Sequence, residues 1–361
     1  MPVRRWIGLL VLVFVVFGAA ILSRGDIPCE VLASQPACYV ALAPGPVEDS
    51  LSIVDVDGAQ TYPSVGELLL TTISVQDSLR LSTWFQSVTS SSTETVPREQ
   101  VFPTGVDRDE LRERNLAAMA DSQLTATIAG LTEAGFELTP EGARIVLVTE
   151  DAVTDALRED DVIVAVGPDR RPIEDSGQVV EAVQANAPGD QMTFHVERDG
   201  EAQTVEVTLG GSPEDPDVAF VGVLLMTEID LPVDIHIDAG SIGGPSAGMI
   251  FALTIVDLLG EDDLTGGHVV AGTGTIDREG TVGPVGGVRQ KVIGATDRRD
   301  GQDPATVFLV PSANLDDARG APVRREITVV PVDELSDALA ALAVLRDGGE
   351  PQGSLVLSAG R

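Results

Sequence analysis

Two glycine-rich segments each lead into an apolar stretch, and each carries a residue type suited to acyl-transfer chemistry. The first segment, Gly243-Gly244-Pro245-Ser246-Ala247-Gly248, precedes the apolar run 249–259, which we expect to form a helix. A serine at a helix start lies where free N–H groups and the helix dipole stabilise negative charge, as an oxyanion requires. Ser246 is therefore a candidate nucleophile, although a helix-capping serine would have the same local sequence.

The second segment, residues 281–295, contains a candidate base for that serine. Its sequence predicts a turn followed by a helix that starts near residue 288, with Lys291 beside the apolar face of the helix. Lys291 is the only lysine among the 23 lysine and arginine residues. Arginine does not lose its proton in proteins, whereas a partly buried lysine does so readily. A general base is thus the functional interpretation of Lys291, and a surface helix lysine is the structural alternative.

Histidine is the other base that a serine nucleophile commonly uses. His195 and His236 both fall in predicted strands. His268 follows Ser246 too closely to leave room for the serine, acid, histidine order of an α/β-hydrolase. An esterase-like site that depends on His268 remains an alternative.

The N-terminus indicates a membrane anchor. Residues 6–22 are 17 consecutive residues without a charge, and Arg4 and Arg5 precede them. This length is close to the minimum for a spanning helix, and the arginines predict a cytoplasmic N-terminus. We therefore expect an anchor over residues 1–24, with the bulk of the chain outside the cytoplasmic membrane. A cleaved signal peptide, with small residues at 18–20, is the alternative.

Composition narrows the classes of partner and cofactor. The formal net charge is −34, which repels phosphate backbones and argues against nucleic-acid binding. Cys29 and Cys38 are the only cysteines. Beyond the membrane they could form a disulfide, and without a nearby histidine they do not predict a metal site. No cofactor is expected.

The pattern of apolar runs and turn residues changes several times after the anchor. Residues 25–131 alternate apolar runs with turns and end in a predicted helix. Residues 132–210 are rich in predicted strands, and the glycine-, proline- and acid-rich stretch that follows indicates a domain boundary. Residues 211–346 alternate strands and helices, and residues 347–361 are expected to be a flexible tail.

Residues 132–210 resemble a bacterial-type PDZ domain, a module that binds extended peptides at a sheet edge. The resemblance rests on Leu157-Arg158-Glu159-Asp160-Asp161-Val162-Ile163, where Asp160 replaces the usual glycine. It implies that Gly142, Ala143, Arg144 and Ile145 lead from the carboxylate-binding loop into the peptide groove. A structural spacer with a PDZ-like fold is the alternative.

The region that contains Ser246 and Lys291 resembles the proteolytic domain of Lon-type proteases. Gly244-Pro245-Ser246-Ala247-Gly248 is the nucleophile motif of that family, and Gly286-Gly287-Val288-Arg289-Gln290-Lys291 is its lysine motif. The resemblance implies a Ser246–Lys291 dyad supported by Thr273, whose hydroxyl lies near the lysine. Gly243 stands where these proteases often have an acidic residue, and we expect Gly243 and Gly244 to support the site.

The whole arrangement resembles the YlbL-like bacterial PDZ–Lon protease family. This implies an α+β fold with an N-terminal transmembrane helix and a Lon-type domain into which a β-rich PDZ-like domain is inserted. No ATP-binding P-loop is present, because the only lysine follows Gln290 rather than glycine. We therefore expect an ATP-independent endopeptidase acting on exported or membrane-adjacent proteins, and a homo-oligomer is possible. A non-catalytic, membrane-anchored PDZ adaptor is the alternative.

Overall fold

The computed structural model describes residues 38–76, 90–102, 108–298 and 302–359. The predicted anchor and Cys29 lie outside these residues, while Cys38 is buried. Within the described residues, no helix combines the length and apolar character needed to cross a membrane.

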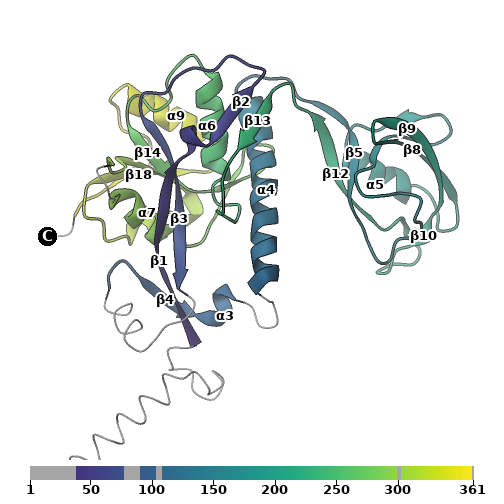
Figure 1. The fold of residues 1–361 in the computed structure, drawn as a ribbon, viewed down its shortest axis with the longest axis horizontal. Coiled ribbons are helices and arrows are strands. Elements are labelled where there is room, and N and C mark those ends of the chain that lie inside the picture. The colour runs from purple at the N-terminus through teal and green to yellow at the C-terminus, as the bar shows by residue number, and fades with distance from the viewer. Residues whose placement is uncertain (1–37, 77–89, 103–107, 299–301, 360–361) are drawn as a thin grey trace, which may run out of the picture. The chain divides into compact units, whose positions relative to one another are not determined.

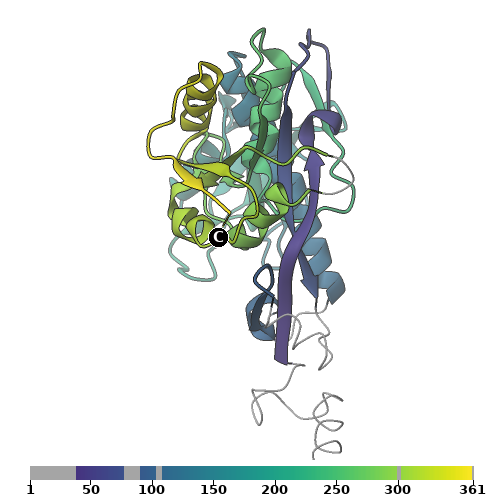
Figure 2. The ribbon, with the colours of Figure 1, turned by 90° about the vertical axis from the view of Figure 1, so that its left-hand side faces the viewer.

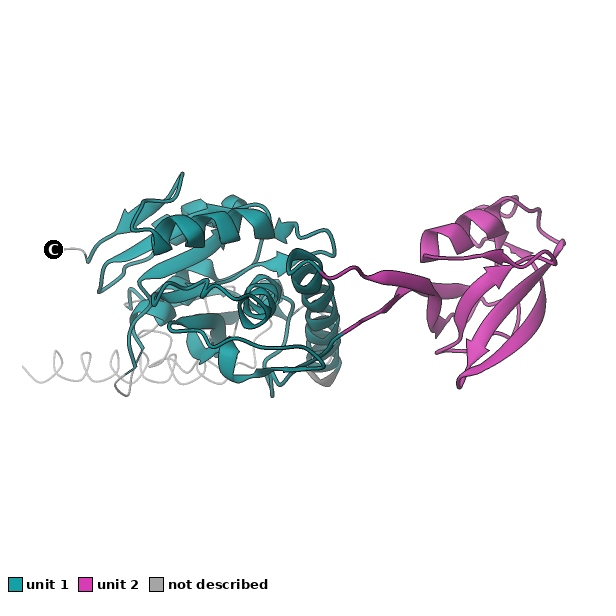
Figure 3. Cartoon of the chain, turned by 90° about the horizontal axis from the view of Figure 1, so that it is seen from above, with its two compact units in different colours: residues 1–135, 233–361 teal, residues 136–232 magenta. Residues whose placement is uncertain are grey.

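The chain divides into two compact units (Figure 3). Unit 2 comprises residues 136–232, and unit 1 comprises the residues before and after it. Unit 2 is therefore an insertion in the sequence of unit 1. It extends to residue 232, beyond the predicted domain boundary after residue 210. The glycine- and acid-rich stretch near residue 210 is a turn inside unit 2, because the strand that follows it pairs with the first strand of that unit.

Unit 1 is built on a mixed sheet (Figure 1). The strand order is β19-β18-β17-β14-β3-β1-β4, with parallel pairing among β18, β17, β14 and β3 and antiparallel pairing elsewhere. These strands are β1 (Tyr39–Asp49), β3 (Glu67–Gln76), β4 (Glu94–Pro97), β14 (Val269–Gly272), β17 (Val307–Pro311), β18 (Ile327–Val332) and β19 (Leu355–Leu357). Figure 2 shows β1 at one side of this unit and the C-terminal strand β19 at the other.

The pairing of β19 with β18 corrects the expectation of a flexible tail over residues 347–361. Two further pairs of short strands complete unit 1: β2 (Val54–Asp57) with β13 (Asp234–Ile237), and β15 (Thr275–Ile276) with β16 (Val282–Gly283).

The helices of unit 1 pack on both faces of the sheet. They are α3 (Arg98–Val101), α4 (Arg108–Glu133), α6 (Gly248–Leu259), α7 (Val288–Thr296), α8 (Leu315–Arg319) and α9 (Leu335–Arg346), with short 3-10 turns η2 (Ser50–Ser52) and η3 (Ser312–Asn314). Ala271 belongs to the core beneath α7, whereas a side chain at the adjacent Gly272 would meet Ile250 of α6. Because neighbouring strand residues face opposite sides, α6 and α7 cover opposite faces.

The helix α6 is buried almost all round, as its continuous apolar sequence requires. It contacts the long helix α4, the helix α9 and the strand β3. A helix that is packed on several sides has little freedom to move, so its N-terminus holds the end of the preceding loop in a fixed position.

Unit 2 is a β-rich domain with one helix. Its main sheet has the order β12-β5-β6-β8-β9, with β7 beside β6. The elements are β5 (Thr139–Val148), β6 (Val162–Val166), β7 (Arg171–Pro172), α5 (Ser176–Gln184), β8 (Gln191–Arg198), β9 (Glu201–Thr208), β10 (Gly210–Gly211), β11 (Ala219–Phe220) and β12 (Val223–Asp230). A single apolar core lies under α5 and includes Phe194, Ile145 and Leu157. The strand β12 lies at one edge of this sheet.

Candidate functional site

Ser246 lies in the turn immediately before α6. The helix begins at Gly248, and Ala247 is its N-cap without a side-chain capping bond. Ser246 is therefore not the helix-capping residue. Gly244 has a φ of 89°, in the left-handed region that favours glycine, which explains the glycine at this position.

The long helix α4 fixes this turn. The N–H of Gly244 donates to the carbonyl oxygen of Asn115 at 2.8 Å, and the Ser122 hydroxyl donates to the carbonyl oxygen of Pro245 at 3.1 Å. Gly243 is exposed, and a side chain there would approach the Cβ of Asn115 to 3.2 Å. The roles of Asn115 and Ser122 were not foreseen in the sequence, because only the fold brings α4 beside residues 243–246.

Lys291 is held in the interior by the helix α7. Gly287 caps the start of this helix with a φ of 70°, again a left-handed conformation. One turn later, Lys291 is only 2% exposed. Its Nζ donates to the Oγ of Ser246 at 2.7 Å and to the Oγ1 of Thr273 at 2.8 Å. The structure thus brings together three residues that are well separated in the sequence.

Burial changes the acidity of the lysine. Removal from water disfavours the ammonium form and lowers the pKa of Lys291 from 10.5 to about 8. Roughly a tenth of the molecules then carry a neutral amine at pH 7, and about half do so at pH 8. A neutral amine at hydrogen-bonding distance from a hydroxyl is able to accept its proton.

Thr273 connects the lysine to the nucleophile turn. It is fully buried, and its hydroxyl accepts from Lys291 and donates to the carbonyl oxygen of Ser246 at 2.9 Å. The N–H of Gly274 donates to the same carbonyl at 3.0 Å, and the N–H of Thr273 donates to Leu309 on β17 at 3.1 Å. The turn between β14 and β15 therefore holds both the serine backbone and the amine.

No hydrogen bond joins a histidine ring to Ser246 within the part of the chain that the structure describes. The ring of His195 bonds to the Thr204 hydroxyl and the carbonyl oxygen of Gly167 inside unit 2. His236 is exposed on β13, and His268 precedes β14 with its backbone bonded to Thr265. The geometry favours lysine over histidine as the partner of the serine.

A hollow of about 230 Å³ adjoins the nucleophile turn. One wall is the face of α4 that carries Leu116, Met119, Ala120 and Gln123, and the other is the loop 237–242. The side-chain amide of Gln123 donates to the carbonyl oxygen of Ile237 at 3.2 Å and so joins the two walls.

The four residues predicted to lead into a peptide groove lie in the interior of a sheet. Gly142, Ala143, Arg144 and Ile145 all lie on β5, which is paired with β6 on one side and β12 on the other. Their strand therefore offers no free edge. Arg144 donates from Nε and an NH2 group to the two carboxylate oxygens of Glu228, at 2.7 and 2.6 Å. Its side chain therefore links β5 to β12.

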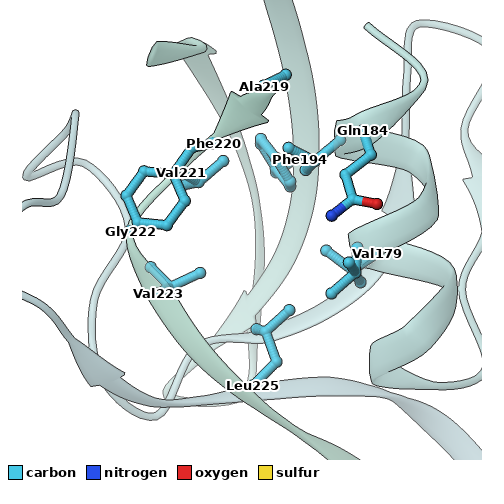
Figure 4. A pocket seen from close by; sticks show the side chains of 11 residues that line it. Val179, Gln184, Phe194, Ala219, Phe220, Val221, Gly222, Val223 and Leu225 are labelled. Carbon is cyan, nitrogen blue, oxygen red and sulfur yellow. The ribbon is translucent and has the colours of Figure 1, made fainter. Parts of the chain in front are cut away.

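An apolar groove lies instead between α5 and the edge strand β12 (Figure 4). Its volume is about 250 Å³, and Gln184 is the single polar side chain among the residues that line it. The others are Val179, Val180, Val183, Phe194, Ala219, Phe220, Val221, Gly222, Val223 and Leu225.

Gly222 shapes one end of this groove. Its φ is 87°, and its carbonyl oxygen accepts from the N–H and the hydroxyl of Thr149, at 2.9 and 3.0 Å. A Cβ at this position would overlap Ala152. The segment Phe220-Val221-Gly222-Val223 lines this groove and lies beyond the predicted domain boundary.

Two family models match this chain, one mainly in each unit, although their bounds differ from those of the units. Residues 226–345 match the Lon protease (S16) C-terminal proteolytic domain, and residues 126–209 match the PDZ domain. Lon protease 2 of Herpetosiphon aurantiacus is 38% identical over 113 residues, which cover 30% of this chain and 13% of that protein. Lon protease 1 of Sorangium cellulosum is 37% identical over 116 residues, which cover 32% and 14%.

Among solved structures, the PDZ domain of an SdrC-like protein from Listeria monocytogenes is similar to this chain. It has 15% sequence identity and a TM-score of 0.22, and the match covers 25% of this chain and 93% of that one. The chain matches less than one sixth of the length of either Lon protease above.

Proposed function

We propose that this chain, which joins a Lon protease C-terminal proteolytic domain to a PDZ domain, is a serine peptidase with Ser246 as nucleophile and Lys291 as general base. The combination of domains is that of a PDZ–Lon protease. The observation that carries the proposal is the distance of 2.7 Å between the Nζ of a buried lysine and the Oγ of Ser246.

The mechanism is acyl transfer through a covalent intermediate. Neutral Lys291 removes the Ser246 proton as Oγ attacks the carbonyl carbon of the peptide bond. N–H groups at the start of α6 stabilise the resulting oxyanion. The lysine ammonium then protonates the leaving amine, the C–N bond breaks, and an ester to Ser246 remains. Water attacks this ester with Lys291 again as base, which releases the carboxylic acid and restores the serine.

Thr273 acts as a positioning residue in this mechanism. By accepting from Lys291 and donating to the Ser246 backbone, its hydroxyl keeps the amine directed at Oγ.

Peptide binding by unit 2 is the second part of the proposal. An edge strand accepts an extended peptide through main-chain hydrogen bonds, and the neighbouring apolar groove takes its side chains. The groove between α5 and β12 supports this role. It serves to hold substrates or regulatory peptides by their apolar ends.

The cellular setting is part of the same proposal. The uncharged run 6–22 after two arginines supports a single membrane anchor with the peptidase outside the cytoplasm. Since the sequence has no P-loop lysine, the peptidase works without ATP. Its substrates are then flexible or locally unfolded segments of exported and membrane-adjacent proteins.

The test is cleavage of casein, a flexible protein, by the full chain and two variants. Ser246→Ala and Lys291→Met remove the nucleophile and the base, and we expect each to lose cleavage while circular dichroism stays native. Ser336→Ala, at an exposed serine of α9, is the matched control and keeps full activity. Undiminished cleavage by Lys291→Met would refute the mechanism. Peptide binding without cleavage by the unaltered chain would favour the adaptor function.

A further inference from the structure

The main chain on either side of Ser246 is held through its carbonyl oxygens. The carbonyl oxygen of Pro245 accepts from the Ser122 hydroxyl at 3.1 Å and from the N–H of Gly248 at 3.4 Å. The carbonyl oxygen of Ser246 itself accepts from the hydroxyl of Thr273 at 2.9 Å. Both peptide groups that flank the nucleophile therefore have a fixed orientation.

A fixed carbonyl also fixes the N–H of the same peptide group. A trans peptide is planar, so its C=O and N–H point in opposite directions. Because the Pro245 carbonyl points at α4, the N–H of Ser246 points away from α4. Within the residues that the structure describes, neither this N–H nor that of Ala247 donates to another protein group. The two N–H groups are thus free to stabilise the oxyanion that forms next to Ser246.

Ser122 is a buried residue that is placed to control one of these N–H groups. It lies in α4, is 4% exposed, and bonds through its hydroxyl to Pro245. Its Oγ also adjoins the first residue of α6, because a Cβ at Gly248 would approach it to 2.8 Å. Linked hydrogen bonds polarise one another, so a donor on the Pro245 carbonyl makes the N–H of Ser246 a stronger donor.

We propose that Ser122 is a positioning residue whose hydroxyl orients and polarises the N–H of Ser246 and thereby stabilises the transition state of peptide cleavage. The inference rests on the proposed peptidase function. Its action is separate from proton transfer, because Lys291 donates to Ser246 and Thr273 and not to Ser122. The effect belongs to the transition state, where the oxyanion exists, and not to the binding of uncleaved substrate.

The test compares Ser122→Ala with the parent on a fluorogenic peptide that spans a casein site cleaved by the parent. We expect kcat to fall about tenfold with KM unchanged, a smaller loss than the roughly 100- to 1,000-fold that follows removal of an oxyanion donor. The pH at which kcat/KM is half-maximal should stay at about 8, because the amine of Lys291 is untouched.

A peptide aldehyde that ends at the same cleavage site reports on the oxyanion directly. The Oγ of Ser246 bonds to the aldehyde carbon, the serine proton passes to Lys291, and the aldehyde oxygen becomes an oxyanion. We expect Ser122→Ala to bind this aldehyde about tenfold more weakly than the parent does. Ser122→Cys keeps a weak donor of similar shape, and its kcat and aldehyde affinity should fall between those of Ser122→Ala and the parent.

Thr127→Val is the matched control. Thr127 is another buried residue of α4, at 5% exposed, and its hydroxyl donates to the carbonyl oxygen of Gln123 within the helix at 2.9 Å. This variant should keep the kcat, KM and aldehyde affinity of the parent. Thermal unfolding followed by circular dichroism shows that each variant is folded.

Three results would count against the proposal. An unchanged kcat and aldehyde affinity in Ser122→Ala, or a shifted pH profile, would overturn the inference while leaving the peptidase function intact. Equal losses in Ser122→Ala and Thr127→Val would assign the effect to packing of α4 and would also overturn it. Failure of the parent to cleave casein would instead overturn the proposed function, and the inference with it.

Discussion

Replacing Lys291 by methionine should stabilise unit 1 at neutral pH, even though we expect it to abolish catalysis. Lys291 is 2% exposed, and burial lowers its pKa from 10.5 to about 8. At about 1.4 kcal/mol per pH unit, this difference means that keeping the buried ammonium costs about 3 kcal/mol below pH 8. Methionine has a similar length and shape without the charge.

Part of that gain is offset. The Thr273 hydroxyl no longer receives a hydrogen bond from Lys291, which lowers the stability by about 1 kcal/mol. The net expectation at pH 6 is a gain of about 2 kcal/mol in the free energy of unfolding. For a unit of this size, that corresponds to a rise in Tm of about 4–8 °C.

The stability difference between Lys291→Met and the unaltered protein shrinks with pH in a defined window. Because the folded-state pKa is depressed, the unfolded chain binds more protons than the folded chain between pH about 8 and 10.5. The unaltered protein therefore gains stability as the pH rises through this window, and the advantage of Lys291→Met disappears by about pH 10.

The assay is thermal unfolding followed by circular dichroism at pH 6, 8 and 10 for the parent, Lys291→Met and Lys291→Arg. Arginine keeps its charge at all three values and should lower Tm at each of them. A Tm difference between Lys291→Met and the parent that does not change with pH would refute the inference of a strained, buried amine.

Three further predictions concern other residues of unit 1. Thr273→Val removes the acceptor for Lys291 and should lower kcat about 10- to 100-fold with little change in KM, measured on a fluorogenic peptide. Thr275→Val on β15 is the control. An unchanged kcat in Thr273→Val would contradict the positioning role. Gly287→Ala should lower Tm and activity, because the position has a φ of 70° and an added Cβ would overlap Ile73. Gly286→Ala should have no effect, because an added Cβ there meets open space. Equal effects of the two substitutions would argue against this account of α7. Asp257→Asn should raise Tm at pH 7, because burial raises the pKa of this carboxyl and its Oδ2 lacks a hydrogen-bond partner. The gain in Tm should shrink towards pH 4, where the carboxyl of the unaltered protein becomes protonated. A gain that does not change with pH would exclude the charge as its cause.

The catalytic region was accessible to sequence reasoning because its chemistry restricts residue types locally. Lysine can lose its proton and serve as a base whereas arginine cannot, so a single lysine in an arginine-rich chain is informative. Glycines such as Gly244 and Gly287 reflect left-handed backbone at the turns that precede α6 and α7. The supporting contacts of Asn115 and Ser122 depend on packing between distant helices, which local patterns do not encode.

The groove of unit 2 was misplaced for a different reason. Turn-forming residues near Gly210 indicate where the chain changes direction, but they do not reveal which strands later pair. The pairing of β12 with β5 joins residues about 80 positions apart and keeps Gly222 in unit 2. Similarly, Leu355–Leu357 has few local signals and becomes a strand because the edge of β18 is available to it.

The central claim is that buried Lys291 activates Ser246, and labelling by a fluorophosphonate probe tests it most directly. The rate of labelling is measured from pH 6 to 10, and the modified residue is identified by mass spectrometry. The account predicts modification at Ser246, a rate that rises through about pH 8 as the amine loses its proton, and loss of labelling in Lys291→Met. Labelling of Ser246 that is independent of pH and equally fast in Lys291→Met would contradict it.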